Sequence, residues 1–199
     1  MRVELFSSTP MVDTMYEVKQ IERKQALDRI LDVHYLHRVP SISFTYGLFL
    51  DGELTGVITY GSPASPHLCR GICGETFKRN VIELNRLVLD NNQKNEASFL
   101  IANSLKLLPK PKIVVSYADT AQNHKGVVYQ ATNWLYTGCS KPRTDIRAEG
   151  GKHPRHHAGN KLDRVFRSGK HRYVMFIGNK REKKVFKQSL NYKIQEYPK

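Results

Sequence analysis

An arginine and an aspartate occupy chemically unusual places in two apolar segments of the sequence. Arg86 lies inside VIELNRLVLD at residues 81–90, and Asp119 directly follows KIVVSYA at residues 112–118. Burying a guanidinium is costly unless an anion lies beside it. Arg86 therefore indicates one of two arrangements. It is either a clamp for a carboxylate, a phosphate or developing negative charge, or a structural partner of Glu83 or Asp119.

Further polar side chains lie at or just beyond the end of the second segment. The run Ser116-Tyr117-Ala118-Asp119 ends an apolar strand, and ligands of open α/β sheets gather beyond the carboxyl ends of strands. Asp119 can accept a proton or orient an amine there, or it can simply cap a loop or a helix. Tyr129, in a short helix expected at 126–133, can donate a proton to a leaving group or serve as an amphipathic packing residue.

Histidines and cysteines give weaker indications of a metal site. His34 and Tyr35 follow each other near the end of an expected helix. A histidine with a tyrosine or aspartate can bind iron or another transition metal, whereas a histidine at a helix end is more often a cap. Cys69 and Cys73 form C-x3-C without a clean second pair, so zinc is disfavoured. Together with Cys139 they are odd in number, which favours reduced thiols.

These side chains need a scaffold, and the sequence pattern predicts an α/β one. A helix is expected at 20–37, a hairpin of strands at 44–50 and 54–60 around Asp51-Gly52, and a loop excursion at 61–80. A strand–helix–strand unit follows, which implies a parallel pair with a right-handed crossover. The remaining elements are strands at 81–90, 112–118, 134–137 and 172–177, helices at 96–108, 126–133 and 180–190, and a loop at 141–160. The fold class is therefore α/β, a mixed sheet of about six strands flanked by helices.

The turn between the strand at 81–90 and the helix at 96–108 is a candidate anion site. A helix N-terminus presents unpaired N–H groups and the positive end of the helix dipole. Asn95 is the expected N-cap, Glu96 favours the first turn, and Lys94 adds positive charge. The turn lacks the glycine pattern of a P-loop or a dinucleotide fingerprint, and an ordinary capped crossover helix is the alternative.

The charge is strongly lopsided. The 199 residues hold 32 Lys and Arg against 18 Asp and Glu, but residues 1–140 carry a net charge of only +2 and residues 141–199 carry +12. Such asymmetry favours a polyanionic partner, most often nucleic acid, over a merely solubilising face. The candidate contacts are Lys152, Arg155, Lys161, Arg164, Arg167, Lys170, Arg172, Lys180, Arg181, Lys183, Lys184 and Lys187.

The sequence predicts a cytoplasmic protein with two regions. No apolar stretch approaches the roughly 20 residues that span a bilayer, and the N-terminus lacks an apolar signal-peptide core. Residues 1–140 are expected to form the catalytic core, and residues 141–199 a basic extension packed on it.

Residues 81–138 resemble the acetyl-CoA-dependent N-acyltransferase (GNAT) superfamily. In that superfamily a central strand, a pyrophosphate-holding turn and a helix bind CoA, and a later helix often bears a tyrosine before a turn into a strand, here YQATNWLYTG. The sequence departs from the pattern at one point. DNNQKNEASF stands where the superfamily carries Q/R-x-x-G-x-G/A, which puts CoA binding in that mode in doubt.

The chain resembles more specifically the bacteriophage Mom family of DNA adenine-modification enzymes. The matching stretches are VHYLHRVPS at 33–41, IELNRLVLD at 82–90, KNEASFLIANSLKLLPK at 94–110, and VVSYAD followed by GVVYQATNWLYTG. The resemblance implies conversion of adenine N6 in DNA to a carbamoylmethyl (methylcarbamoyl) form, which shields phage DNA from host restriction. It implies double-stranded DNA as partner, with the target base flipped out of the helix, and a homodimer as one option.

The resemblance also assigns roles by position. Asp119 would take or steer the N6 proton, Arg86 would stabilise developing negative charge, and Tyr129 would serve the leaving group or bind a metal. The functional residues it implies are His34, Tyr35, Arg86, Ser116, Asp119 and Tyr129. Acetyl-CoA is implied as cofactor, held by the turn residues Lys94, Asn95, Glu96, Ala97 and Ser98, and iron is implied as a metal.

Two other hypotheses remain open from the sequence. The chain could be an ordinary N-acyltransferase for a small amine or a protein lysine, against which the basic C-terminal third argues. It could also be a catalytically dead DNA-binding phage protein, which would tolerate changes at Arg86 and Asp119.

Overall fold

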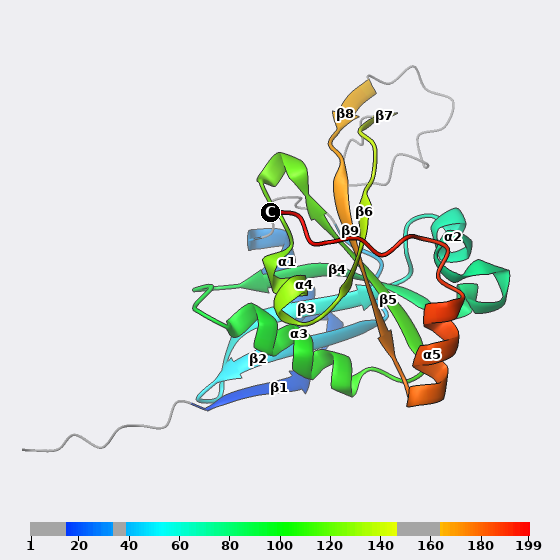
Figure 1. Ribbon diagram of the computed structural model, residues 1–199. Helices are drawn as coiled ribbons and strands as arrows, with labels where there is room; N and C mark the ends of the chain where they lie inside the picture. The colour runs from blue at the N-terminus through cyan, green and yellow to red at the C-terminus, as the bar shows by residue number, and fades with distance from the viewer. Residues whose placement is uncertain (1–14, 34–38, 147–163) are drawn as a thin grey trace, which may run out of the picture.

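A seven-stranded mixed sheet organises the chain in the computed structural model, which describes residues 15–33, 39–146 and 164–199 (Figure 1). The strand order is β1-β2-β3-β4-β5-β9-β6, and β7 and β8 form a separate two-stranded ribbon. The strands are β1 (Tyr16–Gln20), β2 (Phe44–Leu50), β3 (Glu53–Gly61), β4 (Val81–Leu89), β5 (Lys112–Asp119), β6 (Leu135–Cys139), β7 (Arg143–Ile146), β8 (Arg164–Arg167) and β9 (Lys170–Ile177).

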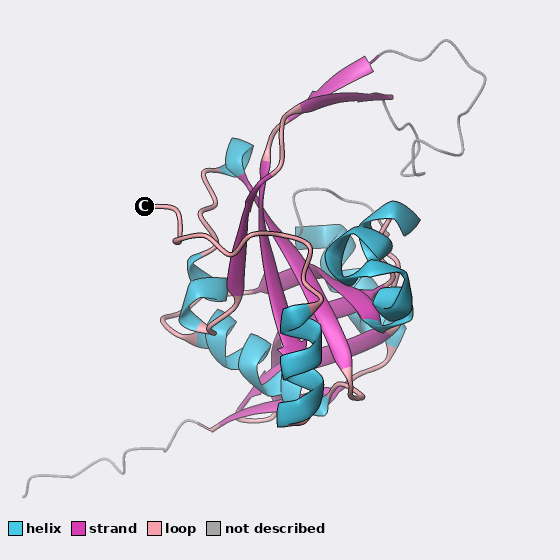
Figure 2. Cartoon of the chain, turned by 45° about the vertical axis from the view of Figure 1, so that its right-hand side comes forward, coloured by secondary structure: helices cyan, strands magenta, loops and turns pink. Residues whose placement is uncertain are grey.

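Helices cover both faces of the sheet (Figure 2). They are α1 (Arg23–Val33), α2 (Pro66–Phe77), α3 (Glu96–Leu107), α4 (Val127–Ala131) and α5 (Lys180–Gln188), with 3₁₀ turns η1 (Lys78–Asn80) and η2 (Thr120–Gln122). The core divides accordingly. Leu100 and Tyr129 from α3 and α4 pack on one face, whereas Ile30, Ile72 and Phe186 from α1, α2 and α5 pack on the other.

The β2–β3 hairpin confirms the turn predicted from Asp51-Gly52. Both residues have positive φ, 49° and 90°. Two left-handed residues make a turn whose twist matches that of the paired strands, and Asp-Gly suits it because neither residue is strongly penalised there.

The parallel pair β4–β5 is joined for only part of its length. The pairing is Val81 with Ile113, Ile82 with Val114, and Glu83 with Val115. Beyond Glu83 and Val115 the two strands separate, although β4 runs on to Leu89 and β5 to Asp119. The right-handed crossover predicted between them is α3. A V-shaped gap therefore opens in the middle of the sheet at the carboxyl ends of both strands.

The last strand lies inside the sheet rather than beside it. β9 pairs antiparallel with β5 at eight positions, from Lys112 opposite Ile177 to Asp119 opposite Lys170, and with β6 on its other edge. Residues 141–199 thus supply an interior strand of the sheet, at the position where the sequence predicts a strand over 172–177.

Several elements differ from those expected. The segment 61–80, expected to be a loop because of its Gly, Pro and Ser content, contains α2 and η1; Gly74 kinks α2 with φ of 80°. The helix expected at 20–37 is described at Arg23–Val33, and residues 34–38 lie outside the described residues. Edge strand β1 and the ribbon β7–β8 were not predicted; β1 has 5 residues and β7 and β8 have 4 each, too few for a clear periodic signal.

No helix among the described residues is long and apolar enough to cross a membrane. Cys69, Cys73 and Cys139 are free thiols, as predicted.

Helix α3 offers a matched test of how its buried face holds the sheet together. Leu100 is fully buried in the core, whereas Leu107 on the same helix is half exposed. Leu100→Ala is expected to lower the free energy of unfolding by about 2–5 kcal/mol, because it removes core contacts and leaves a cavity. Leu107→Ala should cost roughly 0.5 kcal/mol or less. Urea denaturation of both variants checks this, and equal losses would contradict the assigned packing.

Candidate active site

A cavity of about 700 Å³ occupies the gap between β4 and β5. Its volume lies in the range of small-molecule and cofactor sites. Residues from both faces of the sheet line it. Ala97 and Tyr129 come from the face of α3 and α4, Val33 comes from α1 on the other face, and Glu83 and Asp119 come from the strands that flank the gap. The cavity is therefore a passage through the sheet, where two reactants can meet from opposite sides.

A hydrogen-bonded pair of hydroxyls lies at the α4 side of this passage. Ser116 Oγ lies 2.8 Å from the Tyr129 hydroxyl and 2.9 Å from the Leu84 carbonyl oxygen. The serine proton can go to only one acceptor at a time; when the Leu84 carbonyl takes it, the tyrosine hydroxyl donates to Ser116 Oγ. Both residues are buried, and Trp134 and Tyr173 pack on the Tyr129 ring at centroid distances of 5.2 and 5.0 Å.

A β-bulge in β4 shapes the other side. Thr59 pairs with Arg86 and Tyr60 with Leu84, so Asn85 is an extra residue. Its side chain accepts a 2.6 Å hydrogen bond from Thr59 Oγ1 and donates one of 2.6 Å to a backbone carbonyl. Bulges re-aim side chains next to sites.

The bulge brings Glu83 and Arg86 to the same cavity, although residues three apart in a regular strand point to opposite faces. Burial raises the pKa of the Glu83 carboxyl to about 7, while Arg86, Lys170 and a hydrogen bond from the Ala64 backbone oppose the shift. A glutamate that titrates near neutrality suits proton transfer. From the sequence, Glu83 is expected only as a structural partner of Arg86; its position beside a strand arginine is the signal that points to it.

Asp119 is held differently. It caps η2 by accepting a 3.0 Å hydrogen bond from the Ala121 N–H, accepts another from Ser168 Oγ, and pairs with Lys170 Nζ at 3.3 Å. Burial opposes its ionisation, but these hydrogen bonds and the lysine charge outweigh burial and hold the pKa of Asp119 below its ordinary value. The carboxylate is ionised near neutral pH and fully engaged, so the helix-capping alternative describes its geometry.

The turn expected to hold a cofactor is only partly arranged for it. Asn95 occupies the N-cap position with φ of 71°, but its side chain makes no capping hydrogen bond. The Glu96 carboxylate is buried, accepting from the Tyr16 hydroxyl at 3.0 Å and from the Gln93 N–H at 2.7 Å, so Glu96 stabilises the turn instead of facing a ligand. Ala97 lines the main cavity, and Lys94 is exposed.

A second cavity, of about 570 Å³, runs along α3. Asn95 and Ser98 line it near the start of the helix, and Lys106, Lys110 and Lys183 line it further along. It therefore combines polar groups of the cofactor turn with three ammonium groups.

Of the three expected metal ligands, Tyr129 lies within the described residues, and His34 and Tyr35 lie outside them. Within residues 15–33, 39–146 and 164–199, no three His, Cys, Asp or Glu side chains lie close enough to hold a metal ion. Tyr129 has hydroxyl and aromatic neighbours, as described above.

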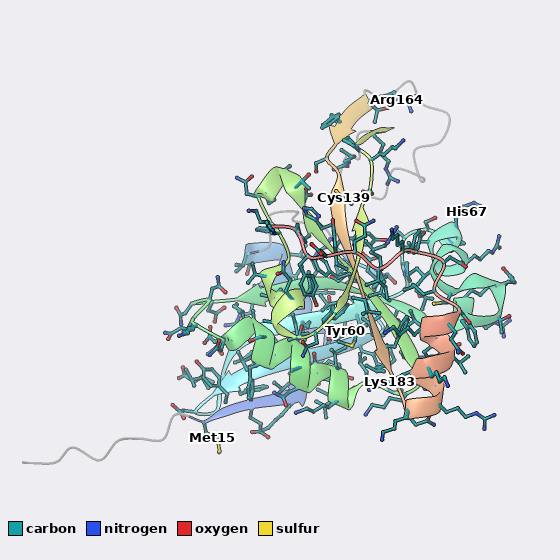
Figure 3. All side chains as sticks on the ribbon, viewed as in Figure 1. Met15, Tyr60, His67, Cys139, Arg164 and Lys183 are labelled. Atoms are coloured by element: carbon teal, nitrogen blue, oxygen red, sulfur yellow. The ribbon has the colours of Figure 1, made fainter. Side chains whose placement is uncertain are left out.

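The predicted nucleic-acid contacts fall into two groups at opposite ends of the molecule (Figure 3, Arg164 and Lys183). Lys152, Arg155 and Lys161 lie outside the described residues. One group follows the β7–β8 ribbon and the start of β9 (Arg164, Arg167, Lys170 and Arg172), and the other follows α5 (Lys180, Arg181, Lys183, Lys184 and Lys187).

The Arg172 side chain is held by contacts within the fold. Its guanidinium donates to Thr137 Oγ1 at 2.9 Å and to the Thr137 carbonyl at 3.0 Å, and it stacks 3.3 Å from the Tyr192 ring. These contacts fix the guanidinium against β6 and the C-terminal tail.

Comparison with known proteins gives a sequence family and a fold. The model of the Mom protein family matches residues 15–199. The methylcarbamoylase mom of Escherichia phage Mu is 30% identical over 186 residues, which cover 83% of this chain and 76% of the relative.

Similar solved structures include two that contain acetyl-CoA. Arabidopsis thaliana NAA60 in complex with acetyl-CoA has a TM-score of 0.51 at 14% identity, over 82% of this chain and 99% of the other. The yncA protein of Salmonella typhimurium, with its cofactor acetyl-CoA, has a TM-score of 0.50 at 9% identity, over 82% and 94%. The predicted GNAT-like fold, a mixed sheet flanked by helices, is confirmed.

The hydrogen bonds of Asp119 predict a pH-dependent contribution to stability. A carboxyl with a depressed folded-state pKa stabilises the fold above its unfolded pKa and loses this effect as the pH falls through the folded value. At pH 6 Asp119→Asn is expected to be less stable than wild type by about 1–3 kcal/mol. The gap should shrink below pH ~3.9, the ordinary aspartate value.

Urea denaturation at pH 6, 4 and 2.5 measures this gap. Ser168→Ala, alone and combined with Asp119→Asn, completes a double-mutant cycle that isolates the Ser168 bond. A gap that stays constant with pH would exclude the assigned ion pair and hydrogen bonds.

Proposed function

The chain belongs to the Mom protein family, and from that membership we propose that it transfers a carbamoylmethyl (methylcarbamoyl) group to N6 of adenine in DNA. The modification would protect phage DNA from host restriction. The observation that carries the proposal is the passage between β4 and β5, with the raised pKa of Glu83 at one part of its wall and the Ser116–Tyr129 hydroxyl pair at another. A transferase needs such an arrangement to bring a donor and an acceptor together.

The α3–α4 side is the proposed entrance of the donor. The gap leaves the facing edges of β4 and β5 without strand pairing, so backbone groups there can bind an extended chain. Ala97 and Val128 form an apolar wall, and the adjoining cavity along α3 offers Lys106, Lys110 and Lys183 for phosphates. These residues fit acetyl-CoA, which would supply the two carbons of the carbamoylmethyl group. The proposed conversion also needs an ammonia-level nitrogen donor, which displaces CoA as its thiol and forms the amide, and a two-electron oxidant that allows adenine N6 to bond to the former methyl carbon. The acetyl-CoA in the similar structures of NAA60 and yncA supports this choice.

Glu83 is the proposed base for the acceptor. A pKa of about 7 leaves about half of the Glu83 carboxyl groups ionised at neutral pH. Enough carboxylate is then present to act as a base, and that carboxylate binds a proton more tightly than an ordinary glutamate does. We propose that the carboxylate takes a proton from adenine N6. The Arg86 guanidinium lines the same wall and would stabilise negative charge that develops during transfer.

Tyr129 is the proposed acid on the donor side. Its hydroxyl oxygen is buried and accepts a hydrogen bond from Ser116 Oγ, so the tyrosine keeps its own proton for a group in the passage. A tyrosine so placed can return a proton to a leaving group. Asp119, by contrast, has a lowered pKa and is engaged by three donors, so we propose that it steers Lys170 and the adjoining backbone and does not accept the proton.

A base inside a duplex cannot reach a passage within a sheet, so the proposal requires that the adenine be flipped out. The net charge of +14 would supply phosphate contacts whose strength falls steeply with salt.

Nucleoside analysis tests the proposed function directly. DNA from cells that express the wild type is expected to contain a heavier deoxyadenosine species that mass spectrometry detects. Arg86→Ala should abolish it by removing charge stabilisation, a loss of about 100-fold or more. Lys24→Gln, at an exposed position of α1, is the control and should retain it. Unmodified DNA from well-folded wild type, purified and supplied with acetyl-CoA and host extract, would overturn the proposal.

The pH profile tests the role of Glu83. Wild-type activity is expected to fall about tenfold per pH unit below an apparent pKa of about 7. Glu83→Gln removes the titrating group, so the rate should drop by about 10²–10⁴-fold and the residual rate should be flat across that range. Single-turnover rates between pH 5 and 9 measure this. A variant that keeps the limb near pH 7 would assign the base to another residue.

A further inference from the structure

The β7–β8 ribbon projects from the body of the molecule as an arm (Figures 1 and 2). It continues the line of β6 and β9 beyond the sheet, and it packs as a two-stranded ribbon of four paired positions. A two-stranded ribbon is narrow enough to enter a groove of duplex DNA.

The register of this arm places like charges opposite each other. Arg143 pairs directly with Arg167 across the ribbon. Like charges at directly opposite positions destabilise a sheet. An anion bound between or beside them reverses that cost, which makes the position suitable for a phosphate. Arg164, at the other end of the same ribbon, is exposed and extends the positive surface.

An aromatic side chain lies on the other face of the ribbon from the Arg143–Arg167 pair, on the same face as Arg164. Phe166 is 72% exposed and is the cross-strand partner of the exposed Thr144. In proteins that bend or open DNA, apolar side chains between basic contacts insert between base steps and partly unstack them.

The residues that join the arm to β9 are hydrogen-bonded to residues at the edge of the passage. The Ser168 hydroxyl donates to Asp119, Thr120 donates to the Gly169 carbonyl from both its N–H and its Oγ1, and Lys170 lines the cavity itself. Phe166 is four residues from Lys170, a reach of about 13 Å in extended chain.

We propose that the β7–β8 arm enters duplex DNA beside the target adenine and that Phe166 is a wedge that fills the space left by the extruded base. The proposal rests on the proposed function, because it takes the duplex around the target adenine as its ligand. Arg143, Arg164 and Arg167 hold the flanking phosphates, and the Asp119 contacts keep the wedge in register with the passage. Phe166 is thus a positioning residue that acts through the DNA.

Phe166→Ala tests the wedge, with Val185→Ala as an exposed apolar control on α5. Three readouts are compared in the full chain. They are DNA binding, fluorescence of 2-aminopurine at the target adenine, and modification of DNA in which that adenine is either paired or opposite an abasic site. Phe166→Ala is expected to bind DNA within a few-fold of wild type. It should lose the fluorescence gain and modify the paired adenine about 10- to 100-fold more slowly, because unstacking is no longer compensated. The abasic partner should restore its rate, because the base is then already unpaired.

The outcomes separate the wedge from the proposed function. If wild type and Phe166→Ala give the same fluorescence gain, the wedge is wrong while DNA modification stands. If wild type extrudes the base but leaves it unmodified, the proposed function fails and the fluorescence still decides the wedge. Wild type that does not bind duplex DNA overturns both.

A charge series checks that the arm is the element that binds. Replacing both Arg164 and Arg167 by Gln is expected to reduce the slope of log K against log[salt] by about 1.8, because two phosphate contacts are lost. Replacing Lys184 and Lys187 of α5 by Gln should leave the slope nearly unchanged. The reverse result would move the DNA to the opposite end of the molecule and contradict the arm.

Discussion

The separation of β4 from β5 after three paired positions is the constraint on which the site depends. Two parallel strands that stayed paired would fill the sheet with hydrogen bonds and leave no passage. Once they part, the carboxyl ends of both strands become the walls of a cavity. The bulge at Asn85 then turns β4 so that Arg86 shares this cavity. Helix α3 must cross the gap because it connects the two strands.

The electrostatics of the passage follow from how each carboxyl is solvated by the protein. Glu83 and Asp119 are two acids near the same lysine, Lys170, yet their pKa values shift in opposite directions. Asp119 receives hydrogen bonds from Ser168 and a backbone N–H, which replace water around its charge. Burial outweighs the opposing groups around Glu83. Environments that shift the pKa values of two carboxyls in opposite directions distinguish a proton acceptor from a carboxylate that keeps its charge.

Much of the fold could be predicted from local sequence patterns, and tertiary contacts determine the rest. Asp51-Gly52 predicted its hairpin, and the apolar runs on either side of α3 predicted the crossover, because those signals are local. The sequence also predicted Arg86, Ser116, Asp119 and Tyr129, all of which line one cavity. It could not predict the pKa of Glu83, since that value depends on burial by segments distant in sequence. Helix α2 was not predicted from the sequence, because its glycines and prolines suggest a loop. Packing on the sheet overrides that tendency.

The insertion of β9 between β5 and β6 has a consequence for the synthesis of the chain. β5 and β6 precede β9 in the chain and lie about two strand spacings apart in the finished sheet, roughly 10 Å, so neither completes its pairing until residue 177 is available. During that interval both present unpaired strand edges, which can pair with other chains. The arm is part of the connection between β6 and β9, and β9 is the strand that fills the space between β5 and β6. A longer or shorter arm would therefore delay or hasten closure without changing any strand of the finished sheet.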